Sequence, residues 1–264
     1  MSVDYEAAAR ELVEAWESGK PCPPLRGRLL PEGDVTSAYV VQQLQVRQWL
    51  QRGHRRVGAK IGLTSRAVQE SFGVFQPDFG VLLDDMAVPD GAEVPMGRLL
   101  QPRVEAEVAF VLGADLPDER ITSADVIRAV DHVLPAIEIV DSRVAGWDIS
   151  IVDTVADNAS SGLFVLGTTP RRLTDVDLRL CGMVLELAGE PVSVGAGAAC
   201  LGNPLHAVQW LAQTMARSGD PLRAGDVVLS GALGPMVPVT AGAAYEARIS
   251  GVGSVRVCFS GAAL

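Results

Sequence analysis

The sequence predicts an α+β fold in which a mixed, barrel-like β-roll is interrupted by helices and preceded by a helical cap. Short apolar segments with the period of a strand dominate the chain, and helices occur between them only at intervals. The glycine-rich segment 195–200 lacks the third glycine of a dinucleotide-binding fingerprint, and Pro204 interrupts the helix that should follow it. These observations disfavour a doubly wound Rossmann sheet.

Composition limits the classes of partner. The 264 residues are 48% hydrophobic and 20% charged, which is typical of one large globular domain with a small appendage. Lys and Arg total 22 against 32 for Asp and Glu, a formal net charge of -10 without any compensating basic run. Such a field repels the phosphate backbone, so we expect no nucleic-acid partner.

Cysteine usage and hydropathy indicate a cytoplasmic protein. The four cysteines are widely spaced and form no C-x-x-C pair, so we expect them to be reduced. No apolar run approaches the length needed to span a membrane, and acidic residues occupy the region where a signal peptide would be apolar. We therefore expect neither membrane association nor secretion.

The sequence pattern predicts a helical cap at residues 1–54 and a catalytic β-roll at residues 55–264. Apolar residues recur at helical spacing from Asp4 to Ser18, and Gly19 ends the pattern. After a proline-rich connector, a second helix is expected from about Thr36 to Gly53. Neither helix carries evident chemistry.

The segment 57–65 predicts a strand that leads into a short helix. Lys60 shares one face of this strand with Gly58 and Gly62, which we expect to leave open space around the ammonium. A helix N-terminus capped by Thr64 or Ser65 could then help to dock a small carboxylate. A lone lysine on a strand can equally be a surface residue whose ammonium reaches water.

Residues 76–80 predict a turn, followed by a strand at 81–83. Asp78 follows Pro77, and an aspartate in that position usually forms the turn itself. If Phe79 and its neighbours remove water from Asp78, however, the carboxyl could hold a raised pKa and transfer protons.

Three glutamates form the clearest candidate site. Residues 103–112 alternate as a strand does, which places Glu105 and Glu107 on one face with Cβ atoms roughly 7 Å apart. Glu138 lies in the otherwise apolar segment 134–140. Two glutamates on one strand face are often merely solvated, but three that meet would repel by about 4 kcal/mol per pair at an effective dielectric near 20. Such a cluster requires a divalent cation.

The remaining chain predicts two further helices within the roll before its last strands. One should be capped by Ser123 and run to about His132, and another should span residues 148–159 and end in the polar cluster 157–162. The last hundred residues read as short strands with one helix, capped by Asn203 with Pro204 at its first position.

Six motifs occur in one order along residues 55–260. They are KIGLTS at 60–65, QPDFG at 76–80, EAE at 105–107, EIVDSR at 138–143, DTVADNASSG at 153–162 and SGALGPM at 230–236. Together they resemble the 2-hydroxypenta-2,4-dienoate (2-keto-4-pentenoate) hydratases, in the hydratase/decarboxylase branch of the fumarylacetoacetate hydrolase superfamily. The first 50 residues carry little of this signature.

The resemblance implies a β-roll of the fumarylacetoacetate hydrolase C-terminal type with a Mg²⁺ or Mn²⁺ site. The matching positions are Glu105, Glu107 and Glu138 for the metal, Lys60 and Asp78 for catalysis, and Ser160 near the substrate carboxylate. It also implies a homo-oligomer, and it leaves open an association with the next enzyme of the pathway, an aldolase, or with a decarboxylase.

The implied activity is that of a hydro-lyase in the meta-cleavage catabolism of aromatics. It adds water to a small 2-hydroxydienoate through a 2-oxo-3-enoate tautomer and gives 4-hydroxy-2-oxopentanoate. A 4-oxalocrotonate (2-oxo-3-hexenedioate) decarboxylase and a non-catalytic partner subunit of such an enzyme stay open as alternatives. The residues do not decide whether Lys60 or Asp78 takes the first proton.

Overall fold

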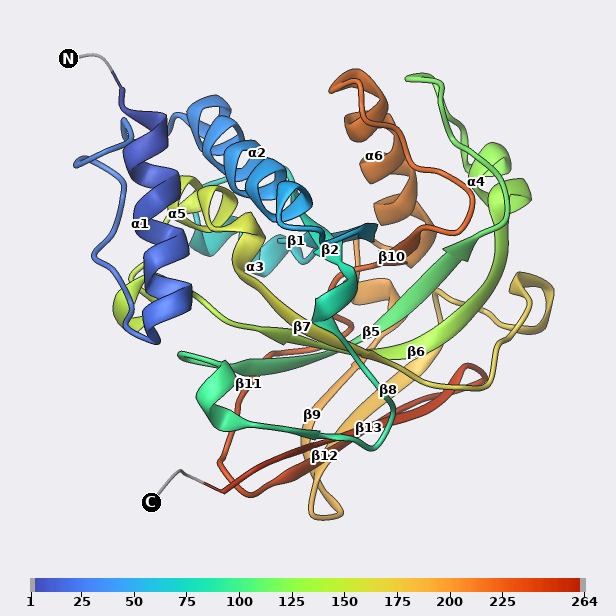
Figure 1. Cartoon of the computed structure of the whole chain (residues 1–264). Helices are drawn as coiled ribbons and strands as arrows, with labels where there is room; N and C mark the ends of the chain where they lie inside the picture. Colours follow the sequence, from blue (N-terminus) through green and yellow to red (C-terminus); the bar gives the residue numbers. More distant parts are fainter. Residues whose placement is uncertain (1–2, 262–264) are drawn as a thin grey trace.

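A computed structural model describes residues 3–261 as two β-sheets that curl around a shared core, with helices against the larger sheet (Figure 1). The larger sheet has eight strands in the order β2-β1-β10-β5-β6-β7-β3, with β11 paired to β5. Its strands are β1 (Arg56–Gly62), β2 (Asp78–Leu83), β3 (Ala87–Val88), β5 (Arg103–Leu112), β6 (Val130–Val140), β7 (Ser161–Leu166), β10 (Val227–Leu229) and β11 (Val237–Pro238). The predicted α+β roll is confirmed.

The smaller sheet has five strands in the order β4-β13-β12-β8-β9. These are β4 (Glu93–Val94), β8 (Gly182–Leu187), β9 (Glu190–Ala196), β12 (Ala244–Ile249) and β13 (Gly253–Phe259). Its inner face contributes Tyr245, Val257 and Phe259 to the main core, where they are 2% exposed or less. The two sheets thereby bury one apolar layer between them.

Six α-helices and several short 3-10 turns complete the described part of the chain. They are α1 (Tyr5–Ser18), α2 (Val35–Gln51), α3 (Arg66–Ser71), α4 (Ser123–Ala129), α5 (Ile151–Ala156) and α6 (Pro204–Arg217). Figure 1 shows α1, α2 and α5 grouped on one side of the molecule, and α6 with α4 on the other. None of these helices combines the length and apolar character that a membrane crossing requires.

The long antiparallel pair β5 and β6 forms the centre of the larger sheet. Val104, Val108 and Phe110 of β5 are fully buried in the main core, as the alternation of the sequence predicts. The register sets Glu105 directly opposite Glu138. One face of this ladder therefore belongs to the core, and the other carries the predicted site.

The N-terminal helices are attached to the roll through a second apolar core and buried amides. Helix α1 begins after Asp4, whose side chain accepts a hydrogen bond from a backbone N–H in the first turn. Gln42 of α2 donates to the carbonyls of Phe79 (2.9 Å) and Val155 (3.1 Å), and Gln45 donates to that of Ala156 (2.6 Å). These bonds fix α2 on β2 and α5.

Two helices are shorter in the structure than the sequence pattern predicted. Helix α4 is capped by Thr122 and not by Ser123, and it ends at Ala129 because the following residues pair with β5 as β6. His132 therefore lies in a strand. Helix α5 covers only residues 151–156 of the expected 148–159. Tertiary strand pairing overrides the local helical pattern in the first case.

All four cysteines are free, as expected for reduced thiols.

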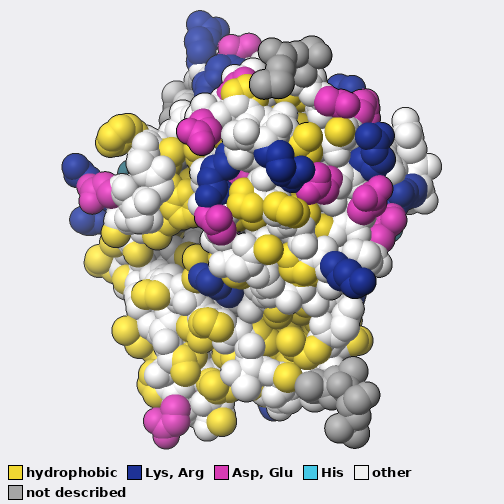
Figure 2. Space-filling view, turned by 90° about the vertical axis from the view of Figure 1, so that its left-hand side faces the viewer, with side chains coloured by type: hydrophobic (Ala, Val, Ile, Leu, Met, Phe, Trp, Pro, Cys, Tyr) yellow, Lys and Arg dark blue, Asp and Glu magenta, His cyan; other side chains and the backbone are white. Residues whose placement is uncertain are grey.

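Figure 2 shows one face of the molecule. The charged side chains on it gather in the upper half, whereas the lower half is largely apolar and nearly uncharged.

Candidate metal and substrate site

Two neighbouring strands bring the three predicted glutamates together. The period of β5 directs Glu105 and Glu107 to one face, and the β5–β6 register adds Glu138 from the opposite strand. One carboxylate oxygen from each of the three lies within 4.8 Å of the others. The convergence that the sequence predicted is thus present in the structure.

The electrostatics of this cluster fit a divalent cation. Glu107 Oε2 accepts a hydrogen bond of 2.7 Å from the Gly231 N–H, but Glu107 Oε1 and Glu138 Oε2 are buried without any partner among the described residues. Burial and the charge of Glu138 raise the pKa of Glu105 to about 7 and that of Glu107 well above its usual value. Uncompensated carboxylate oxygens are costly, and they are the ligands that hard cations prefer.

Lys60 lies beside the cluster in β1. Its side chain is 4% exposed, and Nζ lies 3.0 Å from Glu138 Oε1. Burial opposes the charged form, but the carboxylates of Glu138, Asp78 and Glu105 outweigh it and raise the pKa of Lys60. The ammonium therefore stays protonated, and the alternative of a surface lysine is wrong.

The glycines around Lys60 have a different role from the one predicted. A Cβ on Gly58 would lie 1.8 Å from the carbonyl oxygen of Val227, and one on Gly62 would lie 2.1 Å from Asp78 Oδ1. Both glycines admit close neighbours and do not leave open space for the ammonium. Gly62 in particular makes room for the Asp78 carboxylate.

Asp78 is the first residue of β2 and not part of a turn, which corrects the sequence prediction. It pairs with Gly62 across the β1–β2 ladder, and its side chain is buried. Burial raises the pKa of Asp78 to about 6, an effect that the nearby Lys60 charge partly opposes. Phe79, which stacks on Tyr39 with ring centroids 4.8 Å apart, helps to keep water away.

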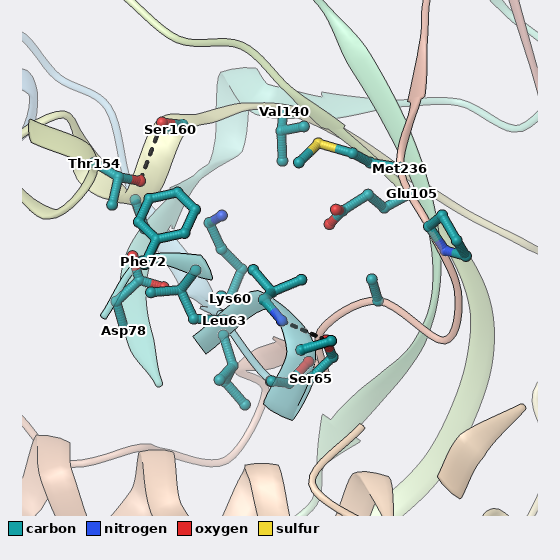
Figure 3. Close-up of a pocket in the computed structure, with 18 of the residues that line it drawn as sticks. Lys60, Leu63, Ser65, Phe72, Asp78, Glu105, Val140, Thr154, Ser160 and Met236 are labelled. Carbon is teal, nitrogen blue, oxygen red and sulfur yellow. Dashed lines mark hydrogen bonds between the residues drawn. The ribbon is translucent and has the colours of Figure 1, made fainter. Parts of the chain in front are cut away.

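A cavity of about 480 Å³ opens onto these groups. Figure 3 shows Lys60, Asp78, Glu105 and Ser160 around it. Glu107 and Glu138 are buried and do not line the cavity. Lys60 is the only cationic side chain among the described residues of the lining, whose walls are mostly apolar. The larger apolar side chains include Leu63, Val68, Phe72, Val140, Trp147, Ile149 and Met236.

The predicted substrate residue Ser160 lies at the cavity edge on the short turn after α5. Its hydroxyl lies 3.2 Å from the Thr154 hydroxyl, a hydrogen bond that is drawn in Figure 3. Thr154 was not among the residues predicted to form the site. Its one signal was a second polar residue beside Asp153 on a short and mostly apolar helix, which is common in proteins without any functional role.

Comparisons with known proteins agree with this geometry. Residues 50–260 match the family described as "Fumarylacetoacetate (FAA) hydrolase C-terminal". The chain is 57% identical to the "TodF product hydratase" of Pseudomonas putida F1, and 56% identical to the "2-keto-4-pentenoate hydratase" of Paraburkholderia xenovorans LB400. Each alignment covers 96% of this chain and 94% of the relative.

Among solved structures, the chain resembles the 4-oxalocrotonate decarboxylase of Pseudomonas putida G7, "complexed with magnesium and adipate". The TM-score is 0.92 at 36% sequence identity, over 98% of this chain and 99% of that one. The family match covers most of the chain, and the relatives are aligned over nearly their whole length. The chain therefore belongs to the fumarylacetoacetate hydrolase family.

Proposed function

We propose that this chain is a divalent-metal-dependent hydratase that adds water to 2-hydroxypenta-2,4-dienoate and gives 4-hydroxy-2-oxopentanoate in the meta-cleavage pathway. The observation that carries the proposal is a cluster of three glutamates, of which Glu107 and Glu138 have buried oxygens without a partner and Glu105 lines a cavity with one cation and mostly apolar walls. The curated relatives that are 56–57% identical to the chain and bear hydratase names support it.

Glu105, Glu107 and Glu138 would hold Mg²⁺ or Mn²⁺. When bound, the ion supplies Lewis-acid polarisation of the substrate's 2-oxygen and carboxylate. The Lys60 ammonium offsets negative charge that develops on the substrate, and the Ser160 hydroxyl donates to the carboxylate. The apolar walls exclude water from the diene tail.

Asp78 is the better candidate for the first proton. The raised pKa of Lys60 keeps its ammonium protonated and unable to accept, whereas a pKa of about 6 leaves Asp78 mostly ionised near neutral pH. Asp78 would take the proton from the 2-hydroxyl and return one to carbon 5, which gives the 2-oxo-3-enoate. Water then adds its hydroxyl to carbon 4, and its proton goes to carbon 3.

The main alternative is decarboxylation of 4-oxalocrotonate, which the similarity to a solved decarboxylase favours. That substrate carries a second carboxylate at its far end. Among the described residues of the cavity lining, no cation other than Lys60 is present to receive it, and Lys60 is already paired with Glu138. The lining therefore suits an apolar tail better.

The test compares both substrates with the purified chain alone. We expect loss of the dienoate absorbance with 2-hydroxypenta-2,4-dienoate, little CO₂ release from 4-oxalocrotonate, and no turnover in excess chelator. Faster release of CO₂ than loss of the dienoate would favour the decarboxylase. The absence of any turnover by the chain alone would favour a partner subunit, and full activity in chelator would refute the metal role.

We also infer that the chain is divided into a cap at 1–54 and a catalytic roll at 55–264. A second inference is that the chain assembles with copies of itself. Leu180, Val192 and Val194 on and beside the smaller sheet expose 68%, 37% and 62% of their surface, and apolar side chains of this kind commonly mark an interface. Light scattering after size-exclusion chromatography would test the assembly, and a monomer would contradict it.

A further inference from the structure

The segment between α5 and β7 forms a left-handed turn at the cavity wall. Asn158, Ala159 and Ser160 have φ values of 51°, 53° and 52°. Asparagine tolerates this region better than most residues, but three consecutive residues other than glycine are rarely found there. Such a backbone persists only where the surrounding structure holds it, and held strain is common at functional sites.

Asn158 attaches this turn to β2. Its side-chain amide accepts from the Val81 N–H at 2.8 Å and donates to the Val81 carbonyl at 2.9 Å. The two segments also approach closely at Gly80, where a Cβ would lie 2.3 Å from the Asn158 carbonyl oxygen. Val81 follows Asp78 on the same strand, so the turn is tied to the strand that carries the proposed base.

A buried arginine holds the two residues that flank the turn. Arg143 pairs with the Asp157 carboxylate and also donates to the Asp157 carbonyl. On the other side of the turn, it donates to the Ser161 carbonyl at 2.6 Å. Between these two anchors, the Ser160 hydroxyl meets that of Thr154 at the edge of the cavity.

We propose that Asn158 is a positioning residue whose amide locks the left-handed turn onto β2 and so sets the Ser160 hydroxyl relative to Asp78 and Lys60. Asn158 is fully buried and does not line the cavity, so it acts through the turn and not through contact with the substrate. This inference rests on the proposed function, in which Ser160 donates to the substrate carboxylate.

A double-mutant cycle tests the proposal. Steady-state kinetics with 2-hydroxypenta-2,4-dienoate and Mg²⁺ would compare Ser160→Ala, Asn158→Ala and the double variant. Loss of a hydrogen bond to a charged group should raise KM about tenfold or more in each single variant, with a smaller change in kcat. If Asn158 acts through Ser160, the double variant should differ from the larger single effect by no more than about twofold.

Further variants separate positioning from a general loss of structure. Asn158→Gly admits the left-handed backbone without the amide, so it should fold, bind Mn²⁺ as the wild type does, and still show the raised KM. Asn203→Ala removes the cap of α6 elsewhere in the fold, and it should lower Tm without changing KM.

Three results would overturn the proposal: a normal KM in Asn158→Gly, multiplication of the two single effects in the double variant, or a fall in kcat alone. If the wild-type chain turns over the substrate but the effects of the two single substitutions on KM multiply in the double variant, only the role of Asn158 fails. If the wild type has no hydratase activity, the proposed function fails, and this inference fails with it.

Discussion

At the scale of single residues, charge is the property that unites the site. The Lys60 ammonium is buried 3.0 Å from Glu138, and both are more than nine-tenths shielded from water. Removing one partner of a buried ion pair leaves the other charge uncompensated, at a cost of about 3–5 kcal/mol. The three glutamates have the same difficulty, because one cationic side chain cannot neutralise all of them.

Replacement of Lys60 by methionine should separate catalysis from metal binding. We expect kcat to fall by about 10²-fold or more, because a preorganised charge that stabilises the developing enolate is lost. Mn²⁺ affinity measured by calorimetry should persist. Lys20 is the only other lysine of the chain and is exposed, so Lys20→Met is a matched control that should keep the wild-type rate. An unchanged rate in Lys60→Met would remove Lys60 from the mechanism.

Replacement of Glu107 by glutamine should weaken metal binding by at least about tenfold, because a ligand charge is lost. The same change removes a buried carboxylate with an unpartnered oxygen, so Tm of the chelated protein should stay the same or rise. Calorimetry with Mn²⁺ and thermal melts would measure both effects, with the exposed Glu190→Gln as the control. Wild-type Mn²⁺ affinity in Glu107→Gln would exclude Glu107 as a ligand.

At the scale of elements, alternation in the sequence was sufficient to place Glu105 and Glu107 on one face of β5, and the apolar run around Glu138 predicted a strand. The partners of these strands were not predictable, because β1 pairs in parallel with β10, some 170 residues later in the chain. Asp78 was placed in a turn because its pairing with Gly62 is a tertiary contact. The hydrogen bonds between the Asn158 amide and Val81 were not predicted either, because they too are tertiary contacts.

The β1–β2 ladder offers a test of how an element positions a group. In Gly62→Ala the new Cβ would lie 2.1 Å from Asp78 Oδ1, so the carboxylate must move. We expect kcat/KM to fall by about 10²-fold. In the wild type, a pKa of about 6 for Asp78 should make kcat/KM decline as pH falls below about 6, and this decline should be lost in the variant.

Gly97→Ala is the matched control for this change. A Cβ there meets nothing within 4 Å, so it should leave the pH–rate profile intact. A wild-type profile in Gly62→Ala would show that the position of Asp78 is not critical.

At the scale of the whole molecule, the acidic cluster couples stability to pH and to metal. The pKa of Glu105 is raised from 4.5 to about 7 in the folded chain, so the folded state binds more protons than the unfolded state within this window. The resulting stabilisation is fully present below the lower value and is lost as pH rises through the upper one. A cation that competes with these protons binds more tightly as pH rises.

We therefore expect Tm of the chelated protein to fall between about pH 5 and about pH 8, and to fall less in Glu105→Gln, which lacks this titration. The gain in Tm on addition of Mn²⁺ should widen over the same range. Melts in chelator and in Mn²⁺ across this range would measure both effects. A gain that shrinks as pH rises would contradict the assignment of the raised pKa to the cluster.

The register between β5 and β6 decides whether the three glutamates meet when the chain folds. Side chains alternate along both strands, so a slip of one residue would turn Glu105 and Glu107 into the apolar interior and bring Val104 and Ala106 to the face of the site. A misassembled sheet would then present to the proposed ion at most one of the three ligands, Glu138. The proposed cation would thus stabilise correctly paired chains over slipped ones before any substrate binds.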